Sequence, residues 1–220
     1  MGGFWLTVVL FDLDGTLLDT VPLITLCFQR MFKKYGDVAI SEEAVHAMFG
    51  PGESVIFRRE FGERWEAVLR DYLGCYDKGH EFLAVEPWMM DILSDLRART
   101  VPTAIITNKE RDTTRLTLER VGLSPYFDLI VTAQDVERPK PYPEGIAKAL
   151  KTLGATKDEA IFLGDTMNDR QAAQAGGVKF VQALWYVPSS KWPHNPMWPV
   201  AYTAQDAAAV LASHLASDSR

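Results

Sequence analysis

Short runs of β-branched and aromatic residues alternate along the chain with longer stretches in which apolar residues recur every three or four positions. The short runs, bounded by turn residues, predict buried strands, and the longer pattern predicts amphipathic helices. We expect strands at Thr7–Phe11, Thr103–Thr107, Leu129–Thr132, Ala160–Leu163 and Val178–Ala183, and a last short one near Val200–Thr203. Helices are expected at about 87–98, 110–121, 143–153, 167–175 and 205–216.

Strands that alternate with helices favour parallel pairing through right-handed crossovers. The predicted fold is therefore α/β, with a doubly wound parallel sheet in a Rossmann-like core. Residues 18–85 break the alternation, because they contain no strand pattern. They hold only amphipathic runs, at Pro22–Tyr35, Ser41–Phe49, Glu53–Phe61 and Glu63–Lys78. We therefore expect a small all-α domain at 18–85, inserted after the first strand of a core made of 1–17 and 86–220.

The composition is that of an ordinary globular protein: 220 residues, 47% hydrophobic and 24% charged. A net charge of −6 disfavours a nucleic-acid partner, whose binding depends on clustered positive charge. No apolar run approaches the roughly 18 residues of a membrane span, so no membrane partner is expected. The two cysteines, Cys27 and Cys75, lack metal-binding or redox spacing. They indicate core thiols in a reducing, cytoplasmic setting. The Trp- and Pro-rich segment Trp185–Pro199 predicts an ordered surface loop held by packing.

A pair of aspartates directly follows the first predicted strand, in the segment Asp12-Leu13-Asp14-Gly15-Thr16. Ligands of open α/β sheets bind at the carboxyl ends of the strands, which is where this pair lies. Two carboxylates so close together repel each other unless a cation or a shared proton intervenes. The pair alone is compatible with a simple Asp-Gly turn after a strand.

Three further polar sets lie where later elements of the predicted sheet end. Thr107 and Asn108 follow the second strand, and Asp165 and Asp169 follow a later one. Lys140 lies in a Pro-rich turn before a helix. Because the carboxyl ends of parallel strands share one edge, we expect all of these side chains to form one site.

The residues of these motifs and their order along the chain resemble those of the haloacid dehalogenase superfamily, in its phosphatase branch. The motifs are Asp-Leu-Asp-Gly-Thr from Asp12, Thr107-Asn108, Lys140 with the prolines that follow it, and Gly-Asp-Thr from Gly164 with the later Asp169. The helical insert resembles the first-type cap of the subgroup that includes phosphoglycolate phosphatase and β-phosphoglucomutase. We refer to residues 18–85 as the cap from here on.

The resemblance implies a role for each matching residue. Asp12 would be the nucleophile and Asp14 the general acid and base. Thr107, Asn108 through its backbone, and Lys140 would bind the phosphoryl oxygens. Mg²⁺ would be held by Asp12, the Asp14 main-chain carbonyl and Asp165, with Asp169 in support. The implied function is Mg²⁺-dependent hydrolysis of a small phosphorylated metabolite through a phosphoaspartate. This agrees with the oxygen ligands that Mg²⁺ prefers and with the lability of an acyl phosphate.

Three alternatives use related chemistry. A phosphomutase of the same fold would carry the same motifs. A phospho-signalling receiver also uses Asp, Thr and Lys on a parallel sheet, but it is shorter and has no helical insert. A dehalogenase needs no metal and, by family resemblance, lacks an acid at the position of Asp14.

The loop Phe49–Glu53, between the second and third predicted cap helices, bears on the choice between hydrolysis and mutase chemistry. By resemblance to β-phosphoglucomutase, its counterpart dips into the active site and contacts the substrate. A mutase must hold a second phosphate there, which favours a basic residue. This loop ends in Glu53 and has no Lys or Arg. We therefore predict that Glu53 helps to set specificity by repelling a second phosphate, and that hydrolysis of a monophosphate is favoured.

Overall fold

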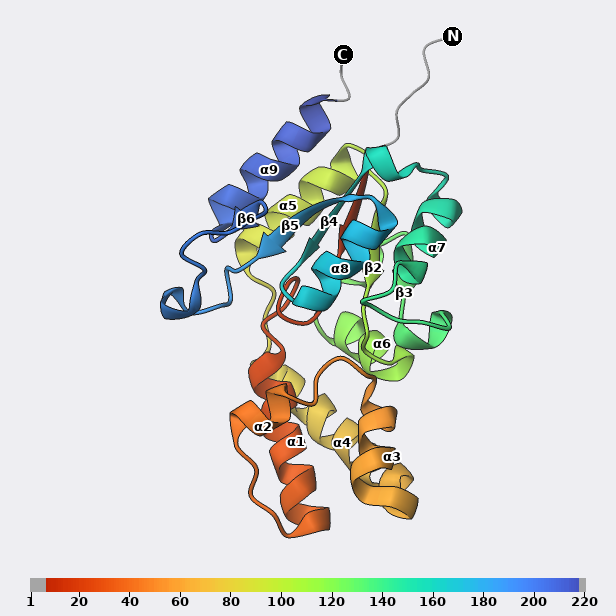
Figure 1. The fold of residues 1–220 in the computed structure, drawn as a ribbon, viewed down its shortest axis with the longest axis vertical. Coiled ribbons are helices and arrows are strands. Elements are labelled where there is room, and N and C mark those ends of the chain that lie inside the picture. Colours follow the sequence, from red (N-terminus) through yellow and green to blue (C-terminus); the bar gives the residue numbers. More distant parts are fainter. Residues whose placement is uncertain (1–6, 218–220) are drawn as a thin grey trace.

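The computed structural model describes residues 7–217, and its centre is one six-stranded sheet (Figure 1). The strand order is β3-β2-β1-β4-β5-β6, and every neighbouring pair is parallel. The strands are β1 (Val8–Phe11), β2 (Thr103–Ile106), β3 (Leu129–Val131), β4 (Ala160–Gly164), β5 (Lys179–Ala183) and β6 (Val200–Ala201). The doubly wound parallel sheet predicted from the alternating pattern is confirmed.

Helices cover both faces of the sheet, which explains why its central strands are apolar throughout. They are α5 (Pro87–Ala98), α6 (Arg111–Arg120), α7 (Glu144–Leu153), α8 (Met167–Gly176) and α9 (Ala204–Ser217). Successive residues of β1 face opposite ways. Val9 and Phe11 pack in the cluster that includes residues of α5, α6 and α9. Val8 and Leu10 pack with residues of α7 and α8. Each such side chain contributes about 1.5–3 kcal/mol when it is fully buried.

Four helices form a separate bundle beyond the end of β1 (Figure 1). They are α1 (Val21–Gly36), α2 (Glu42–His46), α3 (Glu53–Phe61) and α4 (Trp65–Gly79), with 3-10 turns at Gly62–Arg64 and His80–Phe82. Their apolar faces enclose a core of their own, in which the ring of Phe28 lies 5.0 Å from Phe57 and 5.4 Å from Tyr72. Both cysteines lie in this bundle as free thiols, Cys27 buried and Cys75 half-buried.

The Trp- and Pro-rich segment after β5 packs against the loop that follows β1. The indole nitrogen of Trp185 donates a hydrogen bond to the carbonyl oxygen of Thr16 (2.9 Å), and its ring meets Trp88 edge-on. Trp198 donates to the side chain of Gln182 on β5 (2.6 Å). The segment is therefore an ordered loop that supports the loop after β1, as its composition predicted. Among the described residues, no helix has the length and apolar character needed to cross a membrane.

Candidate active site

The chain turns sharply after β1, and this turn brings two motifs together. The backbone N–H of Asp12 donates to the carbonyl of Leu163 on β4 (2.8 Å), which continues the sheet to the first aspartate. Gly15 has a φ of 81°, in the left-handed region that favours glycine. A Cβ atom at Gly15 would lie 2.6 Å from Oδ2 of Asp165. Glycine is therefore needed both for the turn and for the close approach of Asp165.

Lys140 lies between the carboxylates of Asp12 and Asp169 and contacts both. Its Nζ donates to Oδ1 of Asp12 (2.7 Å), to Oδ1 of Asp169 (2.6 Å) and to the carbonyl oxygen of Ile106 (2.7 Å). Burial by itself lowers the pKa of this ammonium group, but the carboxylates of Asp12 and Asp169 outweigh burial and raise it. Lys140 is therefore a fixed positive charge beside the first aspartate.

The carboxyl groups of Asp12 and Asp165 are harder to ionise than ordinary ones. Burial raises the pKa of Asp12 to about 7; Lys140 opposes the rise and Asp169 adds to it. Burial, together with repulsion from Asp12 and Asp169, also raises the pKa of Asp165 well above its usual range. Three carboxylates thus face one ammonium group, an imbalance that a divalent cation would relieve.

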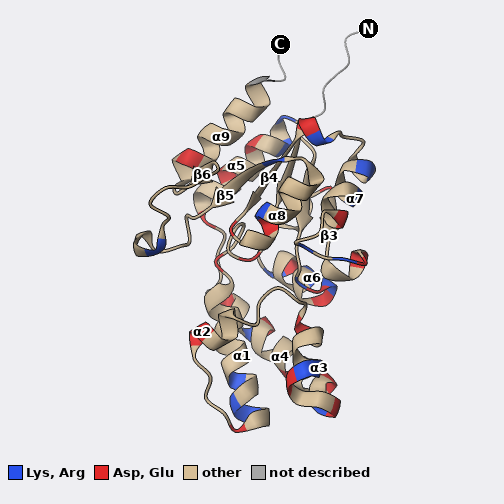
Figure 2. Cartoon of the chain, viewed as in Figure 1, with Lys and Arg blue, Asp and Glu red and all other residues tan. Residues whose placement is uncertain are grey.

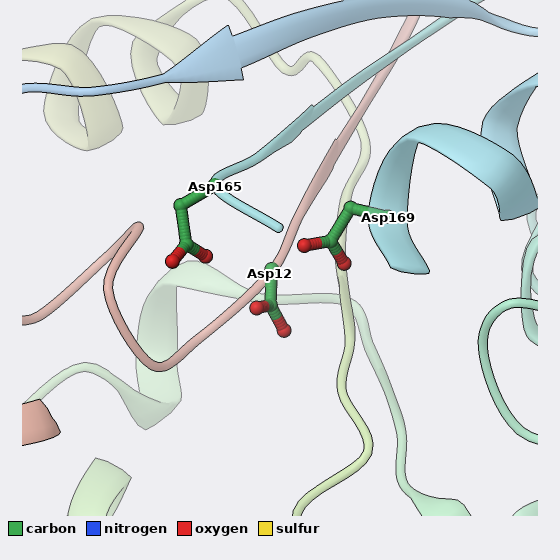
Figure 3. Close-up of side chains that lie close together, drawn as sticks. All are labelled: Asp12, Asp165 and Asp169. Carbon is green, nitrogen blue, oxygen red and sulfur yellow. The ribbon is translucent and has the colours of Figure 1, made fainter. Parts of the chain in front are cut away.

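The geometry of these carboxylates fits a metal ion. One side-chain oxygen from each of Asp12, Asp165 and Asp169 lies within 4.8 Å of the others, and the three carboxylates point toward a common space in Figure 3. Hard oxygen donors suit Mg²⁺, which needs few protein ligands because it retains several waters.

Asp169 differs from the other two carboxylates because both of its oxygens are already engaged. Oδ1 accepts from Lys140, and Oδ2 accepts from the backbone N–H of Thr166 (2.9 Å) in a capping box that begins α8. Asp12 and Asp165 therefore have more free acceptor capacity, which agrees with a supporting role for Asp169.

Thr107 and Asn108 lie at the end of β2, beside Lys140. The hydroxyl oxygen of Thr107 accepts from the backbone N–H of Lys109 (3.1 Å), and its own proton remains available to a ligand. The side-chain amide of Asn108 donates to the carbonyls of Gly50 and Lys140, both at 2.7 Å. The Asn108 side chain thus ties the cap loop to the Lys140 turn.

Lys109 is a site residue that the sequence reasoning missed. Its Nζ lies 3.3 Å from Asp14 and 3.7 Å from Glu53, and its side chain is 2% exposed. Burial lowers the pKa of Lys109, but Asp14, Tyr76 and Glu53 together outweigh burial and raise the pKa. The sequence could have indicated Lys109, because this residue directly follows Thr107 and Asn108 at the end of a predicted strand. Its two partners, however, come from the core and from the cap.

Glu53 and Glu110 form a reciprocal contact between cap and core. Oε2 of Glu53 accepts from the backbone N–H of Glu110 (3.2 Å), at the N-cap of α6. Oε1 of Glu110 accepts from the backbone N–H of Ser54 (2.9 Å), in the first turn of α3. A Cβ at Gly52 would lie 2.8 Å from that same Oε1. We call this pair of contacts the Glu53–Glu110 clasp. Each carboxylate satisfies an unpaired donor at the start of the other helix.

A cavity of about 380 Å³ lies between the strand ends and the cap bundle. Its lining includes most of the residues singled out from the sequence: Asp12, Asp14, Thr107, Asn108, Lys140, Asp165 and Glu53. Asp169 is not among the lining residues, but it accepts a hydrogen bond from Lys140, which is. Glu53 lines the cavity, and its ion pair with Lys109 would partly offset the repulsion of a second phosphate that we predict for it. His46, which the sequence analysis did not single out, also lines the cavity and contacts the hydroxyl of Thr25 (3.1 Å).

Comparison with known proteins agrees with this geometry. Residues 9–183 match the family model described as haloacid dehalogenase-like hydrolase. The chain is 33% identical over 183 residues to a putative pyrophosphatase PpaX of Caldanaerobacter subterraneus subsp. tengcongensis, covering 83% of each chain. It is 32% identical over 182 residues to phosphoglycolate phosphatase 1 of Pseudomonas aeruginosa, covering 78% of this chain and 67% of that protein.

A solved structure shows the same fold. It is a putative β-phosphoglucomutase of Thermotoga maritima, 20% identical, with a TM-score of 0.73 over 94% of this chain and 99% of the other. The resemblance inferred from the motifs is thus confirmed in sequence and in fold. The chain belongs to the haloacid dehalogenase-like hydrolase family, and the curated relatives described above are named as phosphatases.

Proposed function

We propose that this protein is a Mg²⁺-dependent phosphatase that hydrolyses a small phosphorylated metabolite through a phosphoaspartate on Asp12. The observation that carries the proposal is the Lys140 ammonium held between Asp12 and Asp169, with the Asp165 carboxylate converging on the same space. Phosphoryl transfer depends on positioning and charge neutralisation, and this set of groups supplies both.

The proposed reaction has two steps. A carboxylate oxygen of Asp12 attacks phosphorus, the ester P–O bond breaks, and Asp14 donates its proton to the leaving oxygen. Water then attacks the phosphoaspartate and gives a proton to Asp14, which releases phosphate and restores Asp12. The position of Asp14 supports this role, because Thr20 (2.6 Å) and Lys109 hold its carboxyl group at the cavity.

The remaining groups would bind the phosphoryl group and the metal. Mg²⁺, when bound, supplies positive charge that offsets the negative charge of the transferring group. We propose that it is held by the carboxylates of Asp12 and Asp165 and by the main-chain carbonyl of Asp14, with Asp169 in support. Thr107, the Asn108 backbone and Lys140 are proposed to bind the phosphoryl oxygens.

We also propose that residues 18–85 act as a cap over a core made of residues 1–17 and 86–220. The separate hydrophobic core of the bundle supports this division. A phosphomutase of the same fold would need a cation on the cap side for a second phosphate. The two lysines that line the cavity are already paired with carboxylates, which favours hydrolysis. The hydrolase family match and the helical insert speak against a phospho-signalling receiver.

A panel of phosphate esters that includes p-nitrophenyl phosphate tests the proposal. Purified protein with Mg²⁺ should release inorganic phosphate from at least one of them. A folded sample, verified by circular dichroism, that releases phosphate from none of the panel would contradict it.

A further inference from the structure

The wall that the cap contributes to the cavity is mostly apolar. Five of its side chains are hydrocarbon or aromatic: Val21, Ile24, Phe28, Phe49 and Ile56. Figure 2 agrees, since the charged positions of α1 lie toward its far end and the end next to the sheet carries none. The polar side chains on this wall are His46, which contacts Thr25, and Glu53, which is paired with Lys109.

The cations that line the cavity are both buried and already neutralised. Among the described lining residues, the lysines are Lys109 and Lys140. Lys140 contacts Asp12 and Asp169 and belongs to the end of the cavity that would hold the transferring phosphate. Lys109 contacts Asp14 and Glu53, and its Nζ also lies 4.5 Å from the centre of the Tyr76 ring.

Lys109 cannot easily be recruited by a second anionic group on a substrate. Moving it would leave the buried Glu53 and the half-buried Asp14 without a positive partner, which is unfavourable. An anionic group placed against the apolar wall instead would lose its hydration, and the one basic side chain there, His46, is already in contact with Thr25. The cavity is therefore poorly suited to a leaving group that carries its own negative charge.

We propose that the leaving group of the substrate is an uncharged alcohol with a largely apolar body. This inference rests on the proposed phosphatase function and narrows its substrate class. It separates this chain from an enzyme for an anionic leaving group, such as the phosphate released from pyrophosphate or the glycolate released from phosphoglycolate. A volume of about 380 Å³ lies toward the lower end of the roughly 300–1,000 Å³ of small-molecule sites, which fits a small ester.

Two esters that differ by one charge test the proposal directly: benzyl phosphate and 4-carboxybenzyl phosphate. We expect kcat/KM for benzyl phosphate to be at least roughly tenfold higher, because the apolar wall favours the uncharged ring. Equal values, or a preference for the carboxylated ester, would overturn the inference. The phosphatase proposal is tested separately, by p-nitrophenyl phosphate. Hydrolysis of that ester without the benzyl preference defeats only the present inference, and the absence of phosphate release from every ester of the panel defeats the phosphatase proposal itself.

A cation introduced at the rim should reverse part of the selectivity. Phe49 lines the cavity and is 38% exposed, so Phe49→Arg places a positive charge at the edge of the cavity. We expect the ratio of kcat/KM for benzyl over 4-carboxybenzyl phosphate to fall severalfold. Phe82→Arg is the matched control, because Phe82 is 83% exposed and does not line the cavity. Its ratio should equal that of the wild type. An unchanged ratio in a folded Phe49→Arg protein, or an equal fall in the control, would contradict the proposed role of the wall.

Discussion

At the scale of single residues, the site is an arrangement of charges that compensate one another. Lys140 forms ion pairs with Asp12 and Asp169, and Lys109 forms ion pairs with Asp14 and Glu53. Asp165 has no lysine of its own among the described ion pairs, and its pKa is raised well above the usual range by burial and by its acidic neighbours. The clustering of carboxylates around Asp165 supports the cation site proposed there.

Asp12→Asn tests the nucleophile. An amide cannot form the acyl phosphate, so we expect kcat for phosphate release to fall by at least ~10³-fold. Asp158→Asn is the control, because Asp158 is exposed and lies in the 3-10 turn before β4, at the other end of the strand from the site. It should leave turnover close to that of the wild type. Wild-type turnover by an Asp12→Asn protein shown by mass to be free of deamidation would contradict the mechanism.

Removal of divalent metal tests the charge argument. Excess chelator should abolish phosphate release, and added Mg²⁺ should restore it, because the clustered carboxylates otherwise repel an anionic substrate. Ca²⁺ should restore it poorly, since its longer bonds and looser shell disturb the geometry of transfer. Circular dichroism of the stripped protein checks that the loss is not unfolding. Undiminished turnover without metal would rule out the proposed cofactor.

At the scale of elements, helix ends connect the cap to the core. The clasp joins the first turn of α3 to the first turn of α6 through one carboxylate in each direction. The end of α4 also meets α6, since Tyr76 and His80 both contact the hydroxyl of Thr117 (3.1 Å each). These contacts are short and polar, unlike the continuous apolar packing within each part.

Glu110→Ala tests the clasp. The variant removes the acceptor of the Ser54 backbone N–H, so we expect faster hydrogen exchange at Ser54. We also expect a loss of about 0.5–2 kcal/mol in the free energy of unfolding, the usual cost of a lost helix cap. The control is Glu119→Ala, an exposed position on the same helix. It should change stability by no more than about 0.5 kcal/mol. Unchanged exchange at Ser54 in Glu110→Ala would show that the clasp contributes nothing.

His80 should make stability depend on pH. Its ring is buried between the Tyr76 carbonyl (2.7 Å) and Thr117, and burial lowers its pKa below 6.5, with Lys109 and Arg120 adding to the shift and Asp77 opposing it. The unfolded chain therefore binds the proton more readily. The contribution of neutral His80 to the free energy of unfolding is therefore fully present above about pH 6.5. It is lost as the pH falls through the lower pKa of the folded state, because protonation of His80 then favours the unfolded chain.

Urea unfolding of wild type and His80→Gln at pH 7.5 and 5.5 measures this effect. The wild type should lose more stability between the two pH values than His80→Gln does. His194→Gln, in the exposed loop after β5, should behave like the wild type. Equal losses in wild type and His80→Gln would show that His80 does not titrate in this range.

At the scale of the whole molecule, two chain crossings link the cap to the sheet. One lies between β1 and α1 and the other between the 3-10 turn at His80–Phe82 and α5. Two crossings that flank a bundle with its own core suit a rigid-body closure that excludes water. We predict hinges near residues 17–20 and 85–87.

Hydrogen exchange with and without Mg²⁺ and inorganic phosphate tests the hinges. Exchange should slow at one or both crossings when the site is filled, while the buried amides of β4 remain unchanged as an internal control. Identical exchange at both crossings in the two conditions would argue against a moving cap.

Much of the fold was determined by the sequence itself. The five longer strands and the five core helices were predicted to within two residues at each end, because apolar periodicity is a local property of the chain. The convergence of Asp12, Thr107, Lys140 and Asp165 was also predictable. Parallel strands bring their carboxyl ends to one edge, so polar residues placed after each strand must meet there.

The character of the substrate cavity was decided only by tertiary structure. Lys109 pairs with Glu53, and the clasp joins Glu53 to Glu110, 57 positions away in the chain. No local spacing encodes these contacts, because they exist only once α3 docks against the start of α6. The apolar wall has the same origin. Ile24, Phe28 and Ile56 look like ordinary core positions of amphipathic helices, and only the docking of the cap places them in the same cavity as Asp12 and Asp14.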